Sequence, residues 1–207
     1  MSQATSQSAK NNLARANNWI FGVILFFASV GLLASFTLSN EKIELLKDPN
    51  AVLSCSLNVV LNCASVIKSW QATAFGFPNS FIGLMAYPVL ITLAVGYFAG
   101  ARYKKWFLLG AQAGALLGLV FAYWLFFQSV FVIQVLCPWC LLVTFSTTMI
   151  FEAITRYNLR ENNFNFSQQL HQKILKPLHK DYDKFLVAAW VVALIVMVFI
   201  KFPDIFG

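Results

Sequence analysis

The sequence predicts an all-α integral membrane protein: a four-helix transmembrane bundle plus a fifth transmembrane helix, with an extracytoplasmic loop and a half-helix. Three observations lead to this fold class. The 207 residues are 59% hydrophobic and only 11% charged, long stretches carry no charge, and the basic residues fall between those stretches. A helix needs about 20 apolar residues to cross a bilayer. Open sheets are excluded because lipid cannot satisfy their backbone polar groups, and no segment alternates as a barrel strand would.

Four charge-free stretches, residues 16–40, 69–101, 106–151 and 185–200, supply the spans. The third stretch is long enough to fold back once, and the last has a lysine at each end that reaches the interface. Three glycines spaced by four residues in the third span predict close helix packing through small residues. These glycines are Gly110, Gly114 and Gly118, and the five expected spans are Trp19–Leu38, 81–100, 107–130, 138–153 and 185–200.

The basic residues set the expected orientation. Eleven of the 15 lysines and arginines fall in the N-terminal segment or in the two loops that share its side of the membrane. The positive-inside rule therefore places the N-terminus in the cytoplasm. The net charge of +7 then reflects membrane topology, and no nucleic-acid partner is expected. The first span exceeds the apolar core of a signal peptide, so it is interpreted as an uncleaved anchor.

The same pattern divides the chain into regions. Residues 1–17 are rich in Ser, Gln and Asn and predict a disordered cytoplasmic N-terminus. Residues 18–155 form the four-helix bundle, and within it residues 39–80 form the extracytoplasmic loop and a half-helix at the membrane edge. The loop opens with a charged stretch, residues 40–44, that is able to form a short surface helix. Residues 156–183 form a cytoplasmic loop, and residues 184–207 the fifth helix and C-terminus.

The motif Cys137-Pro138-Trp139-Cys140 opens the fourth span. At a helix start, the i, i+3 spacing puts both sulfurs on one face, and proline is favoured in the first turn. The positive end of the helix dipole favours a thiolate there. A pair of this kind is able to open and close a disulfide at the lipid–water boundary, where it meets molecules dissolved in the bilayer.

The other two cysteines, Cys55 and Cys63, lie in the extracytoplasmic loop with seven residues between them. All four cysteines therefore share one side of the membrane, which favours a thiol relay over chance. Two static disulfides are the alternative, but a CxxC disulfide closes a very small loop and stabilises little. A zinc site is a further alternative, although C-x7-C is not a usual zinc spacing and an outside compartment favours disulfides. No metal is expected.

These residues resemble the vitamin K epoxide reductase family, specifically its bacterial members. The resemblance rests on the C-x7-C loop, on the segment Ser69-Trp-Gln-x4-Gly-Phe-Pro-Asn79, and on the CPWC motif. It implies a four-helix bundle around a quinone, a fifth helix in bacterial relatives, and location in the bacterial cytoplasmic (inner) membrane. It also implies thiol oxidation outside coupled to reduction of menaquinone or ubiquinone within the membrane.

The resemblance also implies a role for each matching residue. Cys55 meets the thiol partner, Cys63 transfers to Cys137, and Cys140 faces the quinone. Ser69 and Asn79 hydrogen-bond the quinone carbonyls; the alternatives for them are a surface hydroxyl and a helix N-cap. Many bacterial members continue into a thioredoxin-like domain, whereas this sequence stops at Gly207, so we expect a separate thioredoxin-fold (DsbA-like) extracytoplasmic oxidoreductase as partner, besides membrane lipid. Thr144 replaces the tyrosine of animal members, which weakens the expectation that vitamin K epoxide is the substrate.

The function predicted from the sequence is a membrane thiol oxidase that regenerates this disulfide donor through two cysteine pairs and a quinone. One alternative conducts reducing equivalents outward from the cytoplasm, but it requires cysteines inside the membrane or in the cytoplasm, and the four cysteines leave none there. The other alternative is a transporter or scaffold whose loop carries only structural disulfides. A transporter usually has ionisable residues within its spans, and the predicted spans lack them apart from Glu152 near one end.

Overall fold

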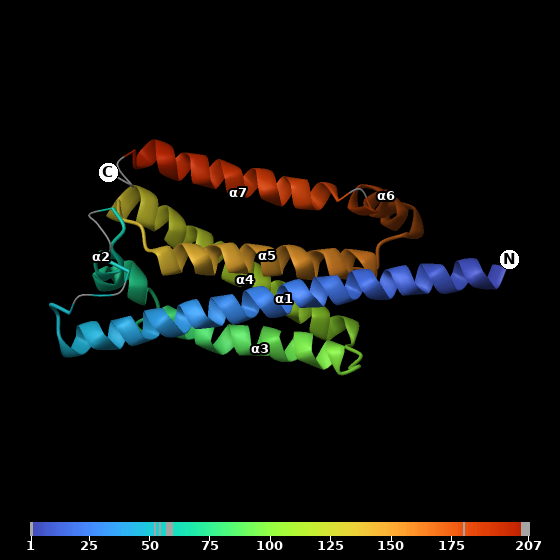
Figure 1. Ribbon diagram of the computed structural model, residues 1–207, viewed down its shortest axis with the longest axis horizontal. Coiled ribbons are helices and arrows are strands. Elements are labelled where there is room, and N and C mark those ends of the chain that lie inside the picture. The colour runs from blue at the N-terminus through green and yellow to red at the C-terminus, as the bar shows by residue number, and fades with distance from the viewer. Residues whose placement is uncertain (1, 52, 54, 57–59, 180, 204–207) are drawn as a thin grey trace.

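The computed structural model describes residues 2–51, 53, 55–56, 60–179 and 181–203. Five long helices run along its long axis (Figure 1), and each is long and apolar enough to cross a membrane. The predicted fold class, an all-α membrane bundle with a fifth spanning helix, is therefore confirmed. The five helices are α1 (Ser2–Lys47), α3 (Ser80–Phe98), α4 (Lys105–Phe127), α5 (Pro138–Arg160) and α7 (Tyr182–Lys201).

Shorter elements connect these helices at the two ends of the bundle. At one end lie α2 (Cys63–Lys68), the 3₁₀ turn η1 (Trp70–Thr73) and the π-helical turn η2 (Gln128–Ile133). At the other end lies α6 (Gln168–His179), in the segment that the sequence assigned to a loop. Lys180 and residues 204–207, which were assigned to that loop and to the C-terminus, lie outside the described residues.

Helix α1 is longer than the sequence pattern predicts. It begins at Ser2, although composition predicts disorder over residues 1–17, and it continues through the charged stretch that was expected to form a separate surface helix. The reason is that propagating a formed helix is easy once a span has nucleated it. The first strong breaker after the span is Asp48-Pro49, and α1 ends there. As a consequence, Glu41 and Lys42 are held on a rigid helix instead of a loop.

The core of the bundle lies where α1 packs between α3 and α5. Its buried centre contains Ile20, Ile24 and Ala28 of α1 together with Ile150 and Ala153 of α5. Because lipid is as apolar as these side chains, tight van der Waals packing stabilises the contact. At Gly31 the packing is especially close: a β-carbon there would lie 2.3 Å from the Tyr87 ring of α3.

This close approach gives a stability prediction for Gly31→Ala. The added methyl group has to displace the Tyr87 ring, and overpacking of this kind costs about 1–3 kcal/mol. We expect the midpoint of thermal unfolding in detergent to fall by a few degrees. Gly22→Ala is the matched control on the same helix, because nothing lies within 4 Å of its β-carbon position. It should unfold at the wild-type temperature or slightly above it, and equal midpoints for both variants would contradict the packing argument.

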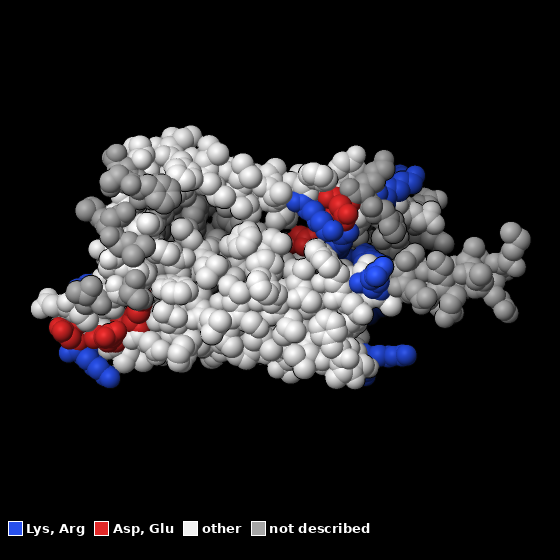
Figure 2. All heavy atoms as spheres, viewed as in Figure 1, with Lys and Arg blue, Asp and Glu red and all other residues white. Residues whose placement is uncertain are grey.

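Charged side chains gather at the two ends of the molecule and leave an uncharged band between them on the face that Figure 2 shows. At the α6 end, Arg156 of α5 donates hydrogen bonds to Asp183 at 2.7 Å and to Asp181 at 2.5 Å. The bond from Arg156, with a second from Lys184, lowers the pKa of Asp181 below its usual value. These contacts attach the start of α7 to the bundle.

Candidate functional site

A short stretch of backbone pairing joins the two cysteine segments. The loop before α2 and the segment before α5 form a parallel bridge between Leu61 and Leu136. The Asn62 N–H donates to the Leu136 carbonyl at 3.0 Å, and the Leu136 N–H donates to the Val60 carbonyl at 2.8 Å. Since Cys63 and Cys137 follow this bridge directly, the pairing brings their side chains together although 74 positions separate them.

The sulfur atoms form a continuous row. Cys55 and Cys63 are joined by a disulfide, and the Sγ of Cys63 lies 3.2 Å from the Sγ of Cys137. Cys137 is the N-cap of α5, and its sulfur accepts a hydrogen bond from the Cys140 N–H at 3.4 Å. Cys63 and Cys137 are both fully buried, so water does not separate the two pairs. Thiol–disulfide exchange needs a thiolate in contact with a disulfide sulfur, and this arrangement supplies that contact.

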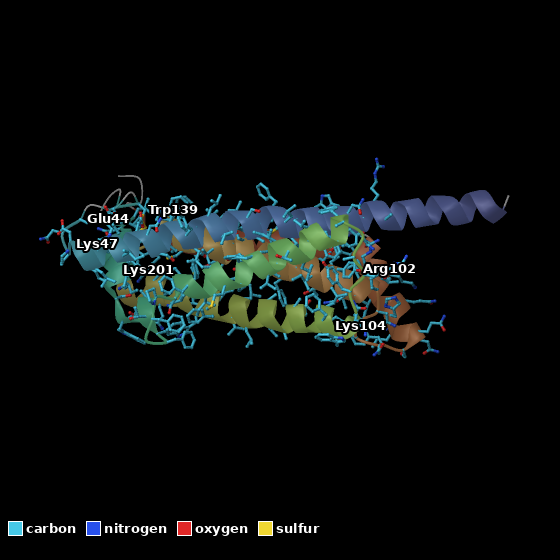
Figure 3. All side chains as sticks on the ribbon, turned by 90° about the horizontal axis from the view of Figure 1, so that it is seen from below. Glu44, Lys47, Arg102, Lys104, Trp139 and Lys201 are labelled. Atoms are coloured by element: carbon cyan, nitrogen blue, oxygen red, sulfur yellow. A yellow bond between two sulfur atoms is a disulfide. The ribbon has the colours of Figure 1, made fainter. Side chains whose placement is uncertain are left out.

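A cavity of about 530 Å³ begins at the CPWC motif and extends into the bundle. Residues of α1, α3, α4 and α5 line it, and the half-helix formed by α2 and η1 covers its end. The lining is mostly apolar, and both Cys137 and Cys140 belong to it. Its volume lies within the range of sites that hold a small organic molecule. Figure 3 shows Trp139 of the motif at the end of the bundle that carries Lys47 and Lys201, opposite Arg102 and Lys104.

Both polar residues singled out by the resemblance line this cavity. Ser69 lies between α2 and η1, and its hydroxyl donates to the Val66 carbonyl at 2.7 Å. Asn79 precedes α3 but makes no side-chain cap bond. Its Nδ2 donates instead to the Gln71 carbonyl at 2.6 Å, and its Oδ1 is buried without a partner among the described residues. A buried amide oxygen without a hydrogen bond is costly, and this oxygen belongs to a residue of the cavity wall.

The cavity is also lined by polar residues that the sequence did not single out, among them Lys42, Gln71 and Tyr87. Lys42 of α1 donates to the Ile67 carbonyl at 2.9 Å, and Gln71 of η1 is paired with Gln128 at 3.3 Å. The Tyr87 hydroxyl lies 2.9 Å from Thr147 Oγ1. The sequence carried a partial signal for Gln71, which stands inside the Ser69–Asn79 motif. Lys42 was not identified because residues 40–44 were interpreted as a short surface helix.

Two of the three α4 glycines face this cavity instead of a neighbouring helix. The prediction of close packing is wrong for Gly110 and Gly114, because nothing lies within 4 Å of either β-carbon position. Only Gly118 approaches another helix, with its β-carbon position 3.8 Å from Thr147 Cγ2. Small residues let helices approach, but the same absence of side chains also leaves room for a ligand. Here the glycines widen the space between α4 and α3.

An all-helical membrane bundle that holds two cysteine pairs in contact at the wall of a cavity defines a membrane thiol–disulfide oxidoreductase. The comparisons with known proteins agree with this class. The model of the vitamin K epoxide reductase family matches residues 22–155, which is most of the chain and covers α3, α4, all four cysteines and most of α1 and α5. The chain belongs to this family. A search of curated proteins found no match.

Proposed function

We propose that this protein is a quinone-dependent thiol oxidase that recharges a separate thioredoxin-fold (DsbA-like) disulfide donor outside the cytoplasmic membrane. The observation that carries the proposal is the 3.2 Å contact between the sulfur of Cys63 and that of Cys137. It supports direct transfer from a loop pair near the surface to a pair that lines an apolar cavity. Two purely structural disulfides would not need to touch each other.

The first exchange takes place at the loop pair. A thiolate of the reduced partner attacks Cys55, a mixed disulfide forms, and Cys63 leaves with the electron pair. The partner's second thiol then displaces Cys55, so the partner departs with a disulfide and the loop cysteines are left reduced. Cys55 is the better target for the partner, because the sulfur of Cys63 is in contact with that of Cys137. Cys55 is itself only 5% exposed, so the loop has to open for the partner to reach it.

The second exchange moves the electrons to the CPWC pair. Cys63 attacks Cys137 of the Cys137–Cys140 disulfide, and Cys140 leaves as a thiolate. Cys55 then attacks Cys63, which closes the loop disulfide again and releases Cys137. The chain at this point has a closed Cys55–Cys63 disulfide and free thiols at Cys137 and Cys140, which is the state that the structure contains.

The residues around the cavity fit a quinone as second substrate. Oxidation of Cys137 and Cys140 to a disulfide yields two electrons and two protons, which convert the quinone to the quinol. Electron uptake places negative charge on the quinone oxygens, and hydrogen-bond donors aimed at them stabilise that charge. Asn79 lines the cavity, and Lys42 adds an ammonium group at its wall. Ser69 also lines the cavity, but its hydroxyl hydrogen is donated to the Val66 carbonyl, which leaves the oxygen as an acceptor. Menaquinone and ubiquinone have different ring systems but both carry two carbonyl groups in para positions, so the cavity polar groups suit either.

The distribution of basic residues supports the membrane orientation that we propose for the protein. Arg102 and Lys104 lie at the end of the bundle opposite Trp139 (Figure 3). Arg156 lies at the α6 end, where it donates to the Leu178 carbonyl at 3.2 Å. The positive-inside rule favours that end in the cytoplasm. The N-terminus would then be cytoplasmic, and both cysteine pairs would face the extracytoplasmic side, where disulfides persist.

The proposal is tested by mixing the purified protein with a short-chain quinone and a reduced DsbA-like protein, and following quinone absorbance. Cys55→Ala should reduce turnover of the protein substrate at least a hundredfold, because the partner loses its point of attack. The same variant should still reduce quinone with a small membrane-permeant dithiol that reaches Cys137 and Cys140 directly. If wild-type protein forms no quinol from either thiol source, the proposed function is wrong.

The open glycine face of α4 gives a separate prediction for quinone binding. Nothing lies within 4 Å of the β-carbon position at Gly114, and Gly114→Leu places four carbon atoms in this open space. We expect the KM for the quinone to rise at least tenfold, with a smaller change in kcat, because the side chain competes with the ligand for room. Val120→Leu is the control, since this residue of α4 is 61% exposed on the outer surface of the helix. An unchanged KM in Gly114→Leu would show that the ligand does not use this part of the cavity.

A further inference from the structure

A buried carboxylate stands beside the loop disulfide. Glu41, near the end of α1, is 5% exposed, and its Oε2 lies 3.1 Å from the Sγ of Cys55. One carboxylate oxygen of Glu41 and the sulfurs of Cys55 and Cys63 all lie within 4.8 Å of one another. Burial of an acidic group is costly unless its surroundings compensate for the loss of water. One turn further along the same helix, Glu44 is exposed, so the helix itself does not require a buried acid.

The two sulfurs of the loop pair have different neighbours. Cys63 faces the sulfur of Cys137 at 3.2 Å, whereas Cys55 faces the Glu41 carboxylate at 3.1 Å. In the disulfide Cys55 carries no proton, but in the reduced pair its thiol would point a proton donor at an oxygen that is able to accept it. The Glu41 carboxylate therefore lies beside the sulfur of Cys55, which has to lose a proton when the disulfide closes.

We propose that Glu41 is a catalytic base that takes the proton of Cys55 as this thiol attacks the Cys63–Cys137 disulfide. In this step the Cys55–Cys63 bond forms and the Cys63–Cys137 bond breaks. The electron pair of the broken bond stays on Cys137, and the proton of Cys55 moves to Glu41. The inference rests on the proposed function, because the mixed disulfide exists only if electrons pass from the loop pair to the CPWC pair.

The chemistry of thiols explains why a base is useful at this point. Only the thiolate attacks a disulfide, and a free cysteine thiol has a pKa near 8.5, so only a few per cent of it is ionised at pH 7. A positioned base typically contributes about 10²–10⁴-fold to such a step. When the partner later displaces Cys55, the protonated carboxyl of Glu41 returns the proton to the leaving sulfur. Glu41 thus ends each cycle as it began.

The other charged groups nearby are directed elsewhere, so Glu41 is the group placed to act as the base. Lys42, the next residue of α1, directs its ammonium to the Ile67 carbonyl, and Lys68 of α2 directs its own to the Pro49 carbonyl at 2.6 Å. From α5, the thiols of Cys137 and Cys140 face the loop pair from the far side of Cys63. Among the described residues, Glu41 is the carboxylate in contact with the reacting sulfurs.

The test compares Glu41→Gln with Glu44→Gln in the purified full-length protein. Each protein turns over with a reduced DsbA-like partner and short-chain quinone, is quenched in acid and alkylated, and the peptide containing Cys63 linked to Cys137 is measured by mass spectrometry. At pH 7 we expect Glu41→Gln to hold at least tenfold more of this linked form than wild type, and to turn over at least tenfold more slowly. Glu44→Gln should match wild type, because its side chain lies on the exposed side of the helix.

The pH profile separates a base from a merely structural residue. At pH 9.5 a thiol ionises without help, so the deficit of Glu41→Gln should shrink to within about twofold of wild type. Glu41→Asp, which keeps a carboxylate, should recover part of the rate at pH 7. The inference is overturned if Glu41→Gln accumulates no linked form, or if its deficit is the same at both pH values. A wild-type protein that forms no quinol would instead overturn the proposed function.

Discussion

Cys140→Ala should abolish quinone reduction, with a loss of at least a thousandfold for both the protein substrate and a small dithiol. Cys137 is held against Cys63 and is fully buried, whereas Cys140 is partly exposed and lines the cavity. Without Cys140 the inner pair has no disulfide to close, so two electrons have no route from sulfur to a quinone. The measurement is quinone absorbance during turnover, with wild-type protein run in parallel.

The loss in Cys140→Ala should be specific to the inner step. The remaining Cys137 thiol still lies 3.2 Å from Cys63, so mild oxidation of the Cys55→Ala/Cys140→Ala double variant, in which neither cysteine remains to resolve the link, should yield a stable Cys63–Cys137 disulfide that peptide mass spectrometry detects. Cys137→Ala is the companion variant and should form no such link, while it also fails to reduce quinone. Quinol formation by Cys140→Ala at more than a few per cent of the wild-type rate would mean that another sulfur donates to the quinone.

The fold was predictable because hydropathy alone determines which segments enter a membrane. Charge-free runs located all five spanning helices, and the predicted boundaries differ from the observed ones mainly at the ends. For α1 and α5 the helix continues well past the apolar run, to Lys47 and Arg160. Helix ends are set by breakers and caps, not by the lipid boundary. The Asp48-Pro49 turn and the left-handed Gln134 before the CPWC motif are examples.

The candidate site was predictable only in part. The spacing of the cysteines indicated two pairs, the family resemblance implied a role for each cysteine, and the structure adds that the pairs touch. That contact depends on the backbone bridge between Leu61 and Leu136. No local sequence pattern predicts backbone pairing between segments so far apart in the chain. Glu41 was missed for a related reason. A charged residue after a span is usually solvated, and only the turn of the loop back onto α1 buries this one beside Cys55.

The α4 glycines show how one sequence pattern serves two structures. A repeat of small residues allows either a close helix neighbour or an open space, and the sequence does not say which. The outcome depends on where α3 lies relative to α4, which is set by the packing of α3 on α1 through Gly31 and Tyr87. Tertiary packing therefore decided the role of the glycines, and the cavity beside them connects the fold to the proposed chemistry.

Asn79→Leu should lower kcat for quinone reduction by about a hundredfold while thiol exchange at the loop pair continues. Removal of one preorganised hydrogen-bond donor from a developing negative charge costs about 10²–10³ in rate. One Nδ2 hydrogen of Asn79 is engaged by the Gln71 carbonyl at 2.6 Å, which fixes the amide and leaves the second hydrogen for a ligand. Its Oδ1 has no partner among the described residues and is able to accept from the quinol hydroxyl.

Three readouts distinguish this role from a structural one. The quinone absorbance assay gives kcat and KM for the quinone. Alkylation gives the rate at which the partner reduces the Cys55–Cys63 disulfide, and thermal unfolding gives the stability. Asn79→Leu should lower kcat for the quinone and leave the rate at which the partner reduces Cys55–Cys63 near the wild-type value. Ser39→Ala, on α1 and outside the cavity lining, is the control; it loses the hydroxyl bonded to Ser80 of α3 at 2.9 Å and should keep most of the quinone activity. If both variants lose quinone reduction equally, Asn79 maintains the start of α3 and does not bind the quinone.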